Sequence, residues 1–202
     1  MLKRSAYARG FTLVELLTAV SIIMLLMTLS LGVQRYASEK TSRSKAEVEV
    51  RALVVACENY KTDQAAYPCS GASDELSSTS ITRIEDAFTF IPANLDLYKQ
   101  ISGDSDLNGI PDGAQGKLPD GKTQADPVYI EFKPSQLRKM EKSGEVQYIR
   151  DPWDTAGVPT PYGYSTKRSK NPDDASAGYN STYDIWSIAK KPETKAAWIT
   201  NW

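Results

Sequence analysis

The sequence predicts an α+β fold in which one long N-terminal helix packs against a small antiparallel β-sheet head. Two observations predict the helix: residues 11–33 form a predominantly apolar run, and residues 34–63 continue it without Pro or Gly. A third observation predicts the head, because short segments with strand-like alternation occur only after residue 127. An order in which helices come first and strands follow is typical of an α+β domain.

The composition limits the chemistry that the protein can perform. Its 202 residues include 24 Lys and Arg, 25 Asp and Glu, two Cys and no His. The absence of His excludes Ser-His-Asp catalysis, Cys-His catalysis and any zinc site that uses His, and two Cys cannot form a four-cysteine site. No spacing singles out a pair of carboxylates for acid–base catalysis. We therefore predict no catalytic residues and no enzymatic activity.

Residues 11–33 have the length of a membrane-spanning helix. A helix of 23 residues is about 35 Å long, which is enough to cross the hydrocarbon core of a bilayer. Lys3, Arg4 and Arg9 precede the run without any acidic residue, so the positive-inside rule places the N-terminus in the cytoplasm and the rest of the chain beyond the membrane. Glu15 lies within this run, and insertion of a charged carboxylate into a membrane costs on the order of 3 kcal/mol. We therefore predict that the Glu15 carboxylate has a partner or reaches the membrane interface.

The first residues carry a motif found in a known class of export signal. After the basic leader, residues 9–16 read RGFTLVEL, which resembles the class III signal of type IV pilins and type II secretion pseudopilins. The resemblance implies that prepilin peptidase removes residues 1–10 by cutting after Gly10 and then N-methylates Phe11. It also implies an ion pair between Glu15 and the Phe11 ammonium of a neighbouring subunit, which would give this costly carboxylate its partner.

Residues 34–68 are predicted to continue the helix as an amphipathic half. Its apolar positions recur at steps of three and four, and we expect this stripe to pack against the head; the positions are Ala46, Val50, Leu53, Val54, Cys57 and Tyr60. Residues 52–68, which end in Tyr67-Pro68, also resemble the end of the long helix in the major pseudopilin of type II secretion.

The two cysteines lie close together in sequence near the end of this helix. Because the predicted topology exposes the head to an oxidising compartment, Cys57 and Cys69 are candidates for a disulfide. A bridge across such a short loop stabilises by roughly 3 kcal/mol in the chain-entropy model. The alternative is two reduced cysteines, with Cys57 a small core residue.

The head divides into an inserted region, residues 69–150, and a β-rich C-terminal part, residues 151–202. A Ser/Thr-rich loop is expected at the start of the inserted region, over residues 70–80. Two helices are expected, the first interrupted at Pro92, over residues 81–101 and 134–142. Strands are predicted at residues 128–132, 146–149, 162–166 and 183–189.

The C-terminal part extends the resemblance. Residues 151–153 (DPW), 161–164 (PYGY) and 183–187 (YDIWS) are similar, in this order, to stretches of major pseudopilins. The chain departs from that family at Asp154, where Gly is usual, and at residues 188–191, where the family holds part of a calcium site. We therefore do not expect this chain to have the calcium site of the family.

Residues 104–112 offer a different candidate calcium site. They read DSDLNGIPD and match the pattern DxDxNGxxD, which places oxygen ligands at alternate positions before a Gly that permits a sharp turn. The ligands would be the backbone carbonyl of Ile110 and the side chains of Asp104, Asp106, Asn108 and Asp112. The alternative is a solvated turn, and Gln115 stands where a full EF-hand has Glu. No other cofactor is expected.

These features predict a structural subunit of a pilus-like filament, similar to the major pseudopilin of type II secretion. The resemblance implies that the chain polymerises with itself from the inner membrane and helps to export folded proteins. Its implied partners are minor pseudopilins, prepilin peptidase, and an inner-membrane platform with its ATPase; no nucleic acid is expected. One alternative is a type IV pilus or competence pilin. Another is a single-pass, membrane-anchored binding or enzymatic domain that does not polymerise.

Overall fold

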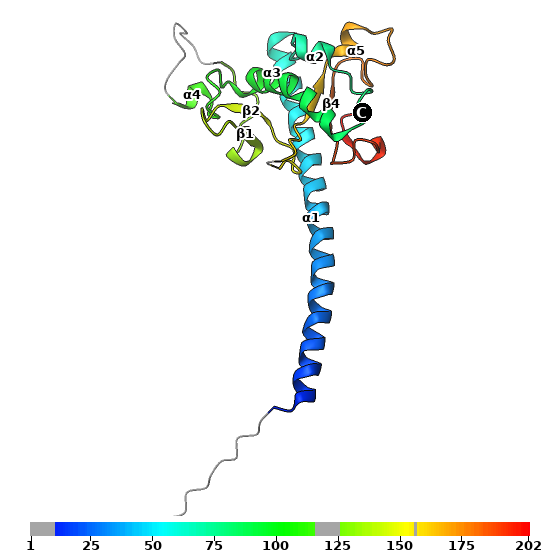
Figure 1. The fold of residues 1–202 in the computed structure, drawn as a ribbon. Coiled ribbons are helices and arrows are strands. Elements are labelled where there is room, and N and C mark those ends of the chain that lie inside the picture. Colours follow the sequence, from blue (N-terminus) through cyan, green and yellow to red (C-terminus); the bar gives the residue numbers. More distant parts are fainter. Residues whose placement is uncertain (1–10, 116–125, 156) are drawn as a thin grey trace, which may run out of the picture. The chain divides into compact units, whose positions relative to one another are not determined.

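The computed structural model describes residues 11–115, 126–155 and 157–202 (Figure 1). The predicted leader, residues 1–10, lies outside the described residues.

The chain divides into two compact units, Met1–Thr41 and Ser42–Trp202. Helix α1, Leu13–Gln64, begins in the first unit and ends in the second. Its extent confirms the predicted long helix, and the small antiparallel sheets of the second unit confirm the α+β fold. Each unit is described by itself below.

The second half of α1 forms one wall of the core of the head. Four positions of the predicted stripe are at most 2 % exposed: Ala46, Val50, Leu53 and Cys57. Val54 and Tyr60 are half-buried and pack against the same cluster. Burial stabilises by about 25 cal/mol per Å² of apolar surface removed from water, so packing of this face, more than helix propensity, holds the helix in place.

Two carboxylates on α1 bond to the rest of the head. Glu49 accepts hydrogen bonds from the Tyr162 hydroxyl at 2.6 Å and from the Gln136 side-chain amide at 3.0 Å. Farther along the helix, Glu58 accepts a hydrogen bond from the Tyr183 hydroxyl at 3.1 Å. These hydrogen bonds hold α1 in position along its axis, in addition to the packing of its buried face.

A short helix, α2 (Gly71–Glu75), lies within the segment predicted to be a loop. It forms because Ser70 and Ser73 make a reciprocal capping box, in which each side chain accepts the backbone N–H of the other residue. The loop prediction for residues 70–80 is therefore wrong at these positions.

The predicted helix over residues 81–101 is confirmed as two consecutive helices. The 3-10 helix η1 (Ile84–Phe90) leads directly into α3 (Ile91–Ser102). Pro92 lies in the first turn of α3, where its missing N–H costs no intrahelical bond, so it begins a new helix instead of bending a longer one.

In the part of the chain that the structure describes, the strands form two antiparallel sheets. One pairs β1 (Leu137–Lys139) with β2 (Val146–Ile149), and the other has the order β3 (Gly163–Ser165), β4 (Asp184–Ser187), β5 (Ile199–Thr200). Strands β2, β3 and β4 lie within three of the predicted segments, whereas β5 was not predicted. The remaining short helices are α4 (Asp112–Gln115), η2 (Pro134–Gln136), α5 (Lys167–Lys170) and η3 (Lys195–Ala197).

Two predictions in the middle of the head are wrong. Residues 128–132, although described, form no strand, because the backbone N–H groups of Tyr129 and Ile130 both donate to the carbonyl of Ile101 at the end of α3. Residues 134–142 form only the single turn η2 before β1 begins. The chain leaves the helical conformation there because Leu137, which is buried, pairs with Ile149 across the sheet.

Strands β3 and β4 approach each other closely at Gly163. This residue pairs with Trp186, and a Cβ atom placed on Gly163 would lie 2.0 Å from the indole ring. Only Gly lets the fully buried ring lie across β3. Trp186 also packs edge-on against Phe90, with 5.3 Å between ring centroids. The PYGY and YDIWS stretches of the sequence therefore meet as paired strands.

The DPW stretch joins the same sheet through a buried carboxyl group. Asp151 is 2 % exposed and accepts hydrogen bonds from the Ser187 hydroxyl on β4 and from the Trp153 backbone N–H. The pKa of Asp151 is raised from 3.8 to about 7, mainly because the carboxyl group is removed from water. The two hydrogen bonds lower the pKa, and the charges of Glu49 and Asp154 raise it.

We predict that Asp151 makes the stability of the head depend on pH. Because its folded pKa lies above the unfolded value, the folded state binds more protons between about pH 4 and about pH 7, and the free energy of unfolding falls as the pH rises through this window. Asp151→Asn should flatten this slope, and Asp173→Asn, at an exposed position, should not. Urea unfolding of the full chain in detergent across this range measures the slope. An unchanged slope in Asp151→Asn would contradict the prediction.

Candidate functional site

Helix α1 begins with a capping box made by Thr12 and Glu15. The Glu15 backbone N–H donates to the Thr12 hydroxyl at 3.2 Å. In return, the Glu15 carboxylate accepts hydrogen bonds from the Thr12 backbone N–H at 2.9 Å and from the Thr12 hydroxyl at 2.8 Å. The arrangement satisfies N–H groups that have no intrahelical partner at a helix start, and the T-x-x-E spacing in the sequence is the signal that predicts it.

The capping box places the predicted assembly residues next to one another. The Glu15 carboxylate bonds to the backbone of the residue that follows Phe11, so it lies near the terminus that cleavage would create. Phe11 is 78 % exposed, and Gly10 lies outside the described residues. In a single chain, Glu15 therefore already has partners. The predicted pairing with Phe11 of a neighbouring subunit is not tested by these contacts.

The apolar side chains of the first unit are exposed on all sides of α1. Every described residue from 11 to 29 is exposed, from Val20 at 40 % to Leu13 at 80 % among the large apolar ones. A helix that is apolar all round is normally buried in a larger protein or in a membrane. None of the helices, as far as the structure describes them, combines the length and the hydropathy that crossing a bilayer requires. The predicted span, residues 11–33, includes residues 30–33, whose side chains are outside the described set.

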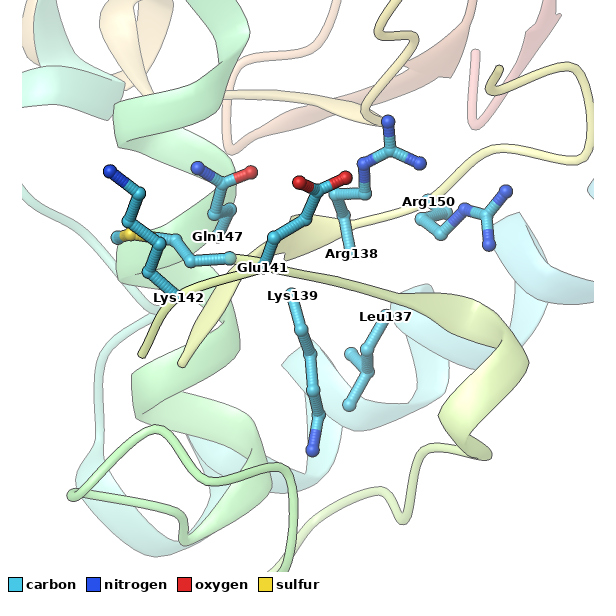
Figure 2. Close-up of a pocket in the computed structure, with 8 residues that line it drawn as sticks. Leu137, Arg138, Lys139, Glu141, Lys142, Gln147 and Arg150 are labelled. Carbon is cyan, nitrogen blue, oxygen red and sulfur yellow. The ribbon is translucent and has the colours of Figure 1, made fainter. Parts of the chain in front are cut away.

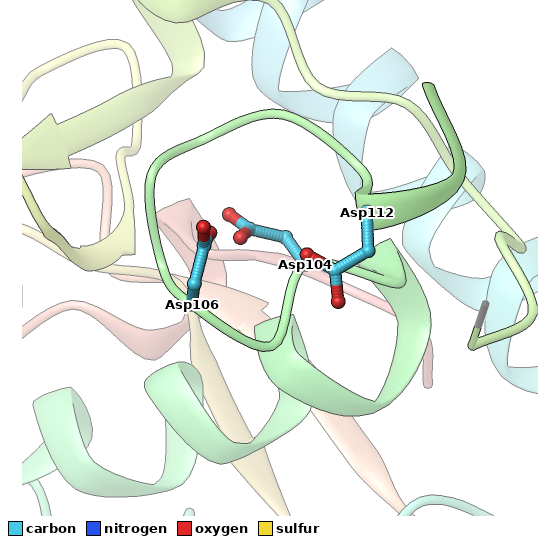
Figure 3. A group of neighbouring side chains, drawn as sticks. All are labelled: Asp104, Asp106 and Asp112. Carbon is cyan, nitrogen blue, oxygen red and sulfur yellow. The ribbon is translucent and has the colours of Figure 1, made fainter. Parts of the chain in front are cut away.

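Residues 104–112 form a tight loop between α3 and α4 (Figure 3). The carboxylates of Asp104, Asp106 and Asp112 each offer an oxygen atom within 4.8 Å of the others. The loop doubles back because Leu107 and Gly109 both adopt the left-handed conformation, with φ of 61° and 88°. Three of the four side chains predicted as calcium ligands are thereby brought together.

Hydrogen bonds within the loop hold the carboxylates in place. Asp104 is fully buried and accepts hydrogen bonds from the Tyr98 hydroxyl at 2.5 Å and from the Gly109 backbone N–H at 2.7 Å. Asp112 accepts a hydrogen bond from the Ser105 hydroxyl at 2.6 Å. Burial raises the pKa of Asp104, and the nearby charge of Asp106 acts in the same direction. Three clustered carboxylates repel one another, and a divalent cation would offset that repulsion.

The other two predicted ligands lie on the same turn. The Asn108 side-chain oxygen accepts a hydrogen bond from the Ile110 backbone N–H at 2.9 Å. The Asn108 backbone carbonyl accepts a hydrogen bond from the Lys139 ammonium, which connects the loop to β1. The predicted ligands thus lie on one loop, as the calcium pattern requires. Occupancy of this loop by a metal ion stays a prediction.

The predicted disulfide is absent from the described residues. Cys57 and Cys69 are both free cysteines, the first buried and the second exposed. The Cys57 thiol lies in the core beside Tyr164, whose hydroxyl donates to the Pro68 carbonyl. Removal from water raises the pKa of the Cys57 thiol, so it is held in its protonated, unreactive form.

Residues 5–31 match the family model described as the prokaryotic N-terminal methylation motif. The match covers part of the predicted leader and the first part of α1 and does not extend into the head. Neither a curated protein nor a solved structure matches the chain. The chain therefore carries a prepilin signal of the type IV pilin kind, which fits a structural, pilin-like subunit that a prepilin peptidase processes.

We predict that calcium stabilises the head through the loop. Millimolar CaCl₂ should raise the melting temperature of the full chain in detergent relative to EGTA, since the ion binds the folded loop and not the unfolded one. Asp106→Ala, which removes an exposed ligand, should abolish the increase, whereas Asp63→Ala at the end of α1 should preserve it. If calcium does not change the melting temperature of the unsubstituted chain, the loop is a turn without a metal.

Proposed function

We propose that this protein is a filament subunit that builds the pseudopilus of a type II protein secretion system as its major pseudopilin. The match of residues 5–31 to the N-terminal methylation motif carries the proposal. The α+β head, the resemblance of residues 52–68, and the three C-terminal stretches that meet around β3 and β4 support the choice of a secretion pseudopilin. The chain would catalyse no reaction of its own.

Before assembly, the subunit is an inner-membrane protein with residues 11–33 as its single span. The basic residues of the leader hold the N-terminus in the cytoplasm, and the head lies on the other side. Prepilin peptidase cuts between Gly10 and Phe11 and methylates the new terminus. The cut creates an ammonium group at Phe11, close to the Glu15 carboxylate that caps α1.

Assembly buries the apolar surface that α1 exposes. The described residues from 11 to 29 are exposed around the whole helix, so the helices of neighbouring subunits can replace lipid on every side. Glu15 of one subunit pairs with the Phe11 ammonium of another, which gives the polymer a defined register. Minor pseudopilins, the inner-membrane platform and its ATPase are the proposed assembly partners.

The head carries one proposed stabilising feature. We propose that the 104–112 loop binds calcium through Asp104, Asp106, Asn108, Ile110 and Asp112, which would stiffen the polar region between α3 and β1. Calcium binding is not required for filament assembly in this proposal.

We predict that the mature protein begins with N-methylated Phe11. Peptide mass spectrometry of protein extracted from membranes should find a terminal peptide that starts at Phe11 and carries one methyl group. The same preparation from cells without prepilin peptidase should instead give the intact leader. An intact Met1 terminus in cells that contain the peptidase would exclude the entire class of pilin-like subunits.

We predict that the charge of Glu15 is needed for assembly and that its capping role is not. Glu15→Gln keeps a side chain that can close the capping box but removes the charge. Thr12→Ala removes the cap and keeps the charge. Glu15→Gln should be processed and inserted but form few filaments, whereas Thr12→Ala should assemble normally.

Filaments are counted by electron microscopy of sheared fractions, and processing is followed by mass spectrometry. Normal filaments in Glu15→Gln would contradict the ion pair. Secretion of folded proteins is measured in the same strains, because a pseudopilin variant that fails to assemble should block it. Unchanged secretion together with loss of surface pili would assign the chain to a type IV pilus instead.

A further inference from the structure

An open groove lies on the β1–β2 hairpin of the head (Figure 2). It has a volume of about 660 Å³ and is formed by both strands and the turn between them. Four of its eight lining residues are basic and one, Glu141, is acidic; the basic residues are Arg138, Lys139, Lys142 and Arg150. The side chains of Arg138 and Lys142 lie on one side of β1 with Glu141, whereas that of Lys139 points to the other side (Figure 2). The sequence did not indicate this surface, because Arg150 joins Arg138, Lys139 and Lys142 only when β1 and β2 pair.

Two of the cations are held in position by a buried carboxylate. Arg150 donates from Nε to Asp154 at 2.9 Å, and an Arg138 guanidinium nitrogen lies 3.6 Å from the same oxygen atom. The Asp154 side chain is fully buried, whereas the side chains of Arg138 and Arg150 are 26 % and 31 % exposed. Asp154, the position where the resembling family has Gly, thus organises two arginines at the surface.

The carboxylate does not use all the hydrogen-bonding capacity of these arginines. Each guanidinium has five N–H donors, and one Asp154 carboxylate neutralises only one of the two positive charges. Asp154 also accepts hydrogen bonds from the Tyr148 hydroxyl and the Thr160 backbone N–H, both at 2.9 Å, so its position is fixed independently of the arginines. Arginines held in this way can bind a further carboxylate without a large loss of side-chain entropy.

We propose that the groove binds an acidic surface of a second copy of this chain, and so forms a contact between neighbouring heads in the filament. This inference rests on the proposed function. Without residues 1–10 the chain has 21 basic and 25 acidic residues, and outside the groove it has 17 basic against 24 acidic ones. The rest of the subunit is therefore acidic, which is complementary to the groove.

The symmetry of a filament favours the same assignment. A helical polymer is built from head-to-tail contacts, in which two different patches of one chain must be complementary. A basic groove on a chain that is otherwise acidic meets this requirement. Electrostatic complementarity of this kind gives a contact its orientation and suppresses wrong registers.

Photo-crosslinking in cells tests the contact. A photoreactive amino acid replaces Met140, which lines the groove and is 42 % exposed, and the crosslinked species are identified by mass spectrometry. The expected product is a dimer of this chain, with the second copy attached through a peptide that contains Asp or Glu. Crosslinks only to another protein, to nucleic acid or to lipid would overturn the proposal.

Charge variants show whether the groove causes the contact. Arg138→Gln combined with Lys142→Glu leaves Arg150 bonded to Asp154 and should reduce the dimer crosslink by roughly tenfold. Lys190→Gln combined with Lys191→Gln, outside the groove, is the control and should leave the crosslink unchanged. An equal yield in both double variants would overturn the proposal, since the contact would then not depend on the groove.

A second crosslinker position separates this inference from the proposed function. The same amino acid at Leu17, in the exposed apolar part of α1, reports contact between the N-terminal helices. Dimers through Leu17 without dimers through Met140 would leave the filament intact and overturn the groove contact alone. The absence of dimers at both positions, together with the absence of filaments, would overturn the proposed function and the groove contact with it.

Discussion

The buried stripe of α1 is the constraint on which the head depends. The two sheets have only two and three short strands, which is too little to enclose a core without a helix. Ala46, Val50, Leu53 and Cys57 of α1 pack in one cluster with side chains of α3 and of both sheets. The helix that carries the assembly signal at its start is therefore also the wall of the head's core at its end.

The core that α1 shares with α3 and the sheets positions the candidate calcium loop and the basic groove. The candidate calcium loop leaves the end of α3, and its buried Asp104 bonds to Tyr98, which belongs to the cluster. The basic groove lies on β1 and β2, whose Leu137 and Ile149 are members of the same cluster. Lys139 connects the two, because it lines the groove and donates to the Asn108 carbonyl of the loop. The candidate calcium loop and the basic groove thus obtain part of their geometry from the core.

The sequence predicted the long helix because the spacing of its apolar residues is regular over many turns. The stripe positions Ala46, Val50, Leu53 and Cys57 are buried, as this spacing requires. It failed at residues 128–132, where five alternating residues cannot reveal whether a strand partner exists. The two residues of β5 are too few to give a pattern at all. The groove was missed for a related reason: Arg138 and Arg150 meet only after β1 and β2 pair, and Asp154 joins them from a turn. The cluster of Asp104, Asp106 and Asp112 was predictable because these residues lie within nine consecutive positions.

The capping box at the start of α1 changes the thermodynamics of filament growth. Because the Glu15 carboxylate is already bonded to Thr12 in the single chain, joining a filament exchanges one set of charge-assisted hydrogen bonds for another. The free energy that the Glu15 charge would contribute to assembly is therefore the difference between the two sets, which is less than the strength of the proposed ion pair alone. Elongation would then be driven by burial of the apolar helix surface. In the proposed filament, the Glu15 charge would matter chiefly because it keeps the Phe11 ammonium from being buried without a partner.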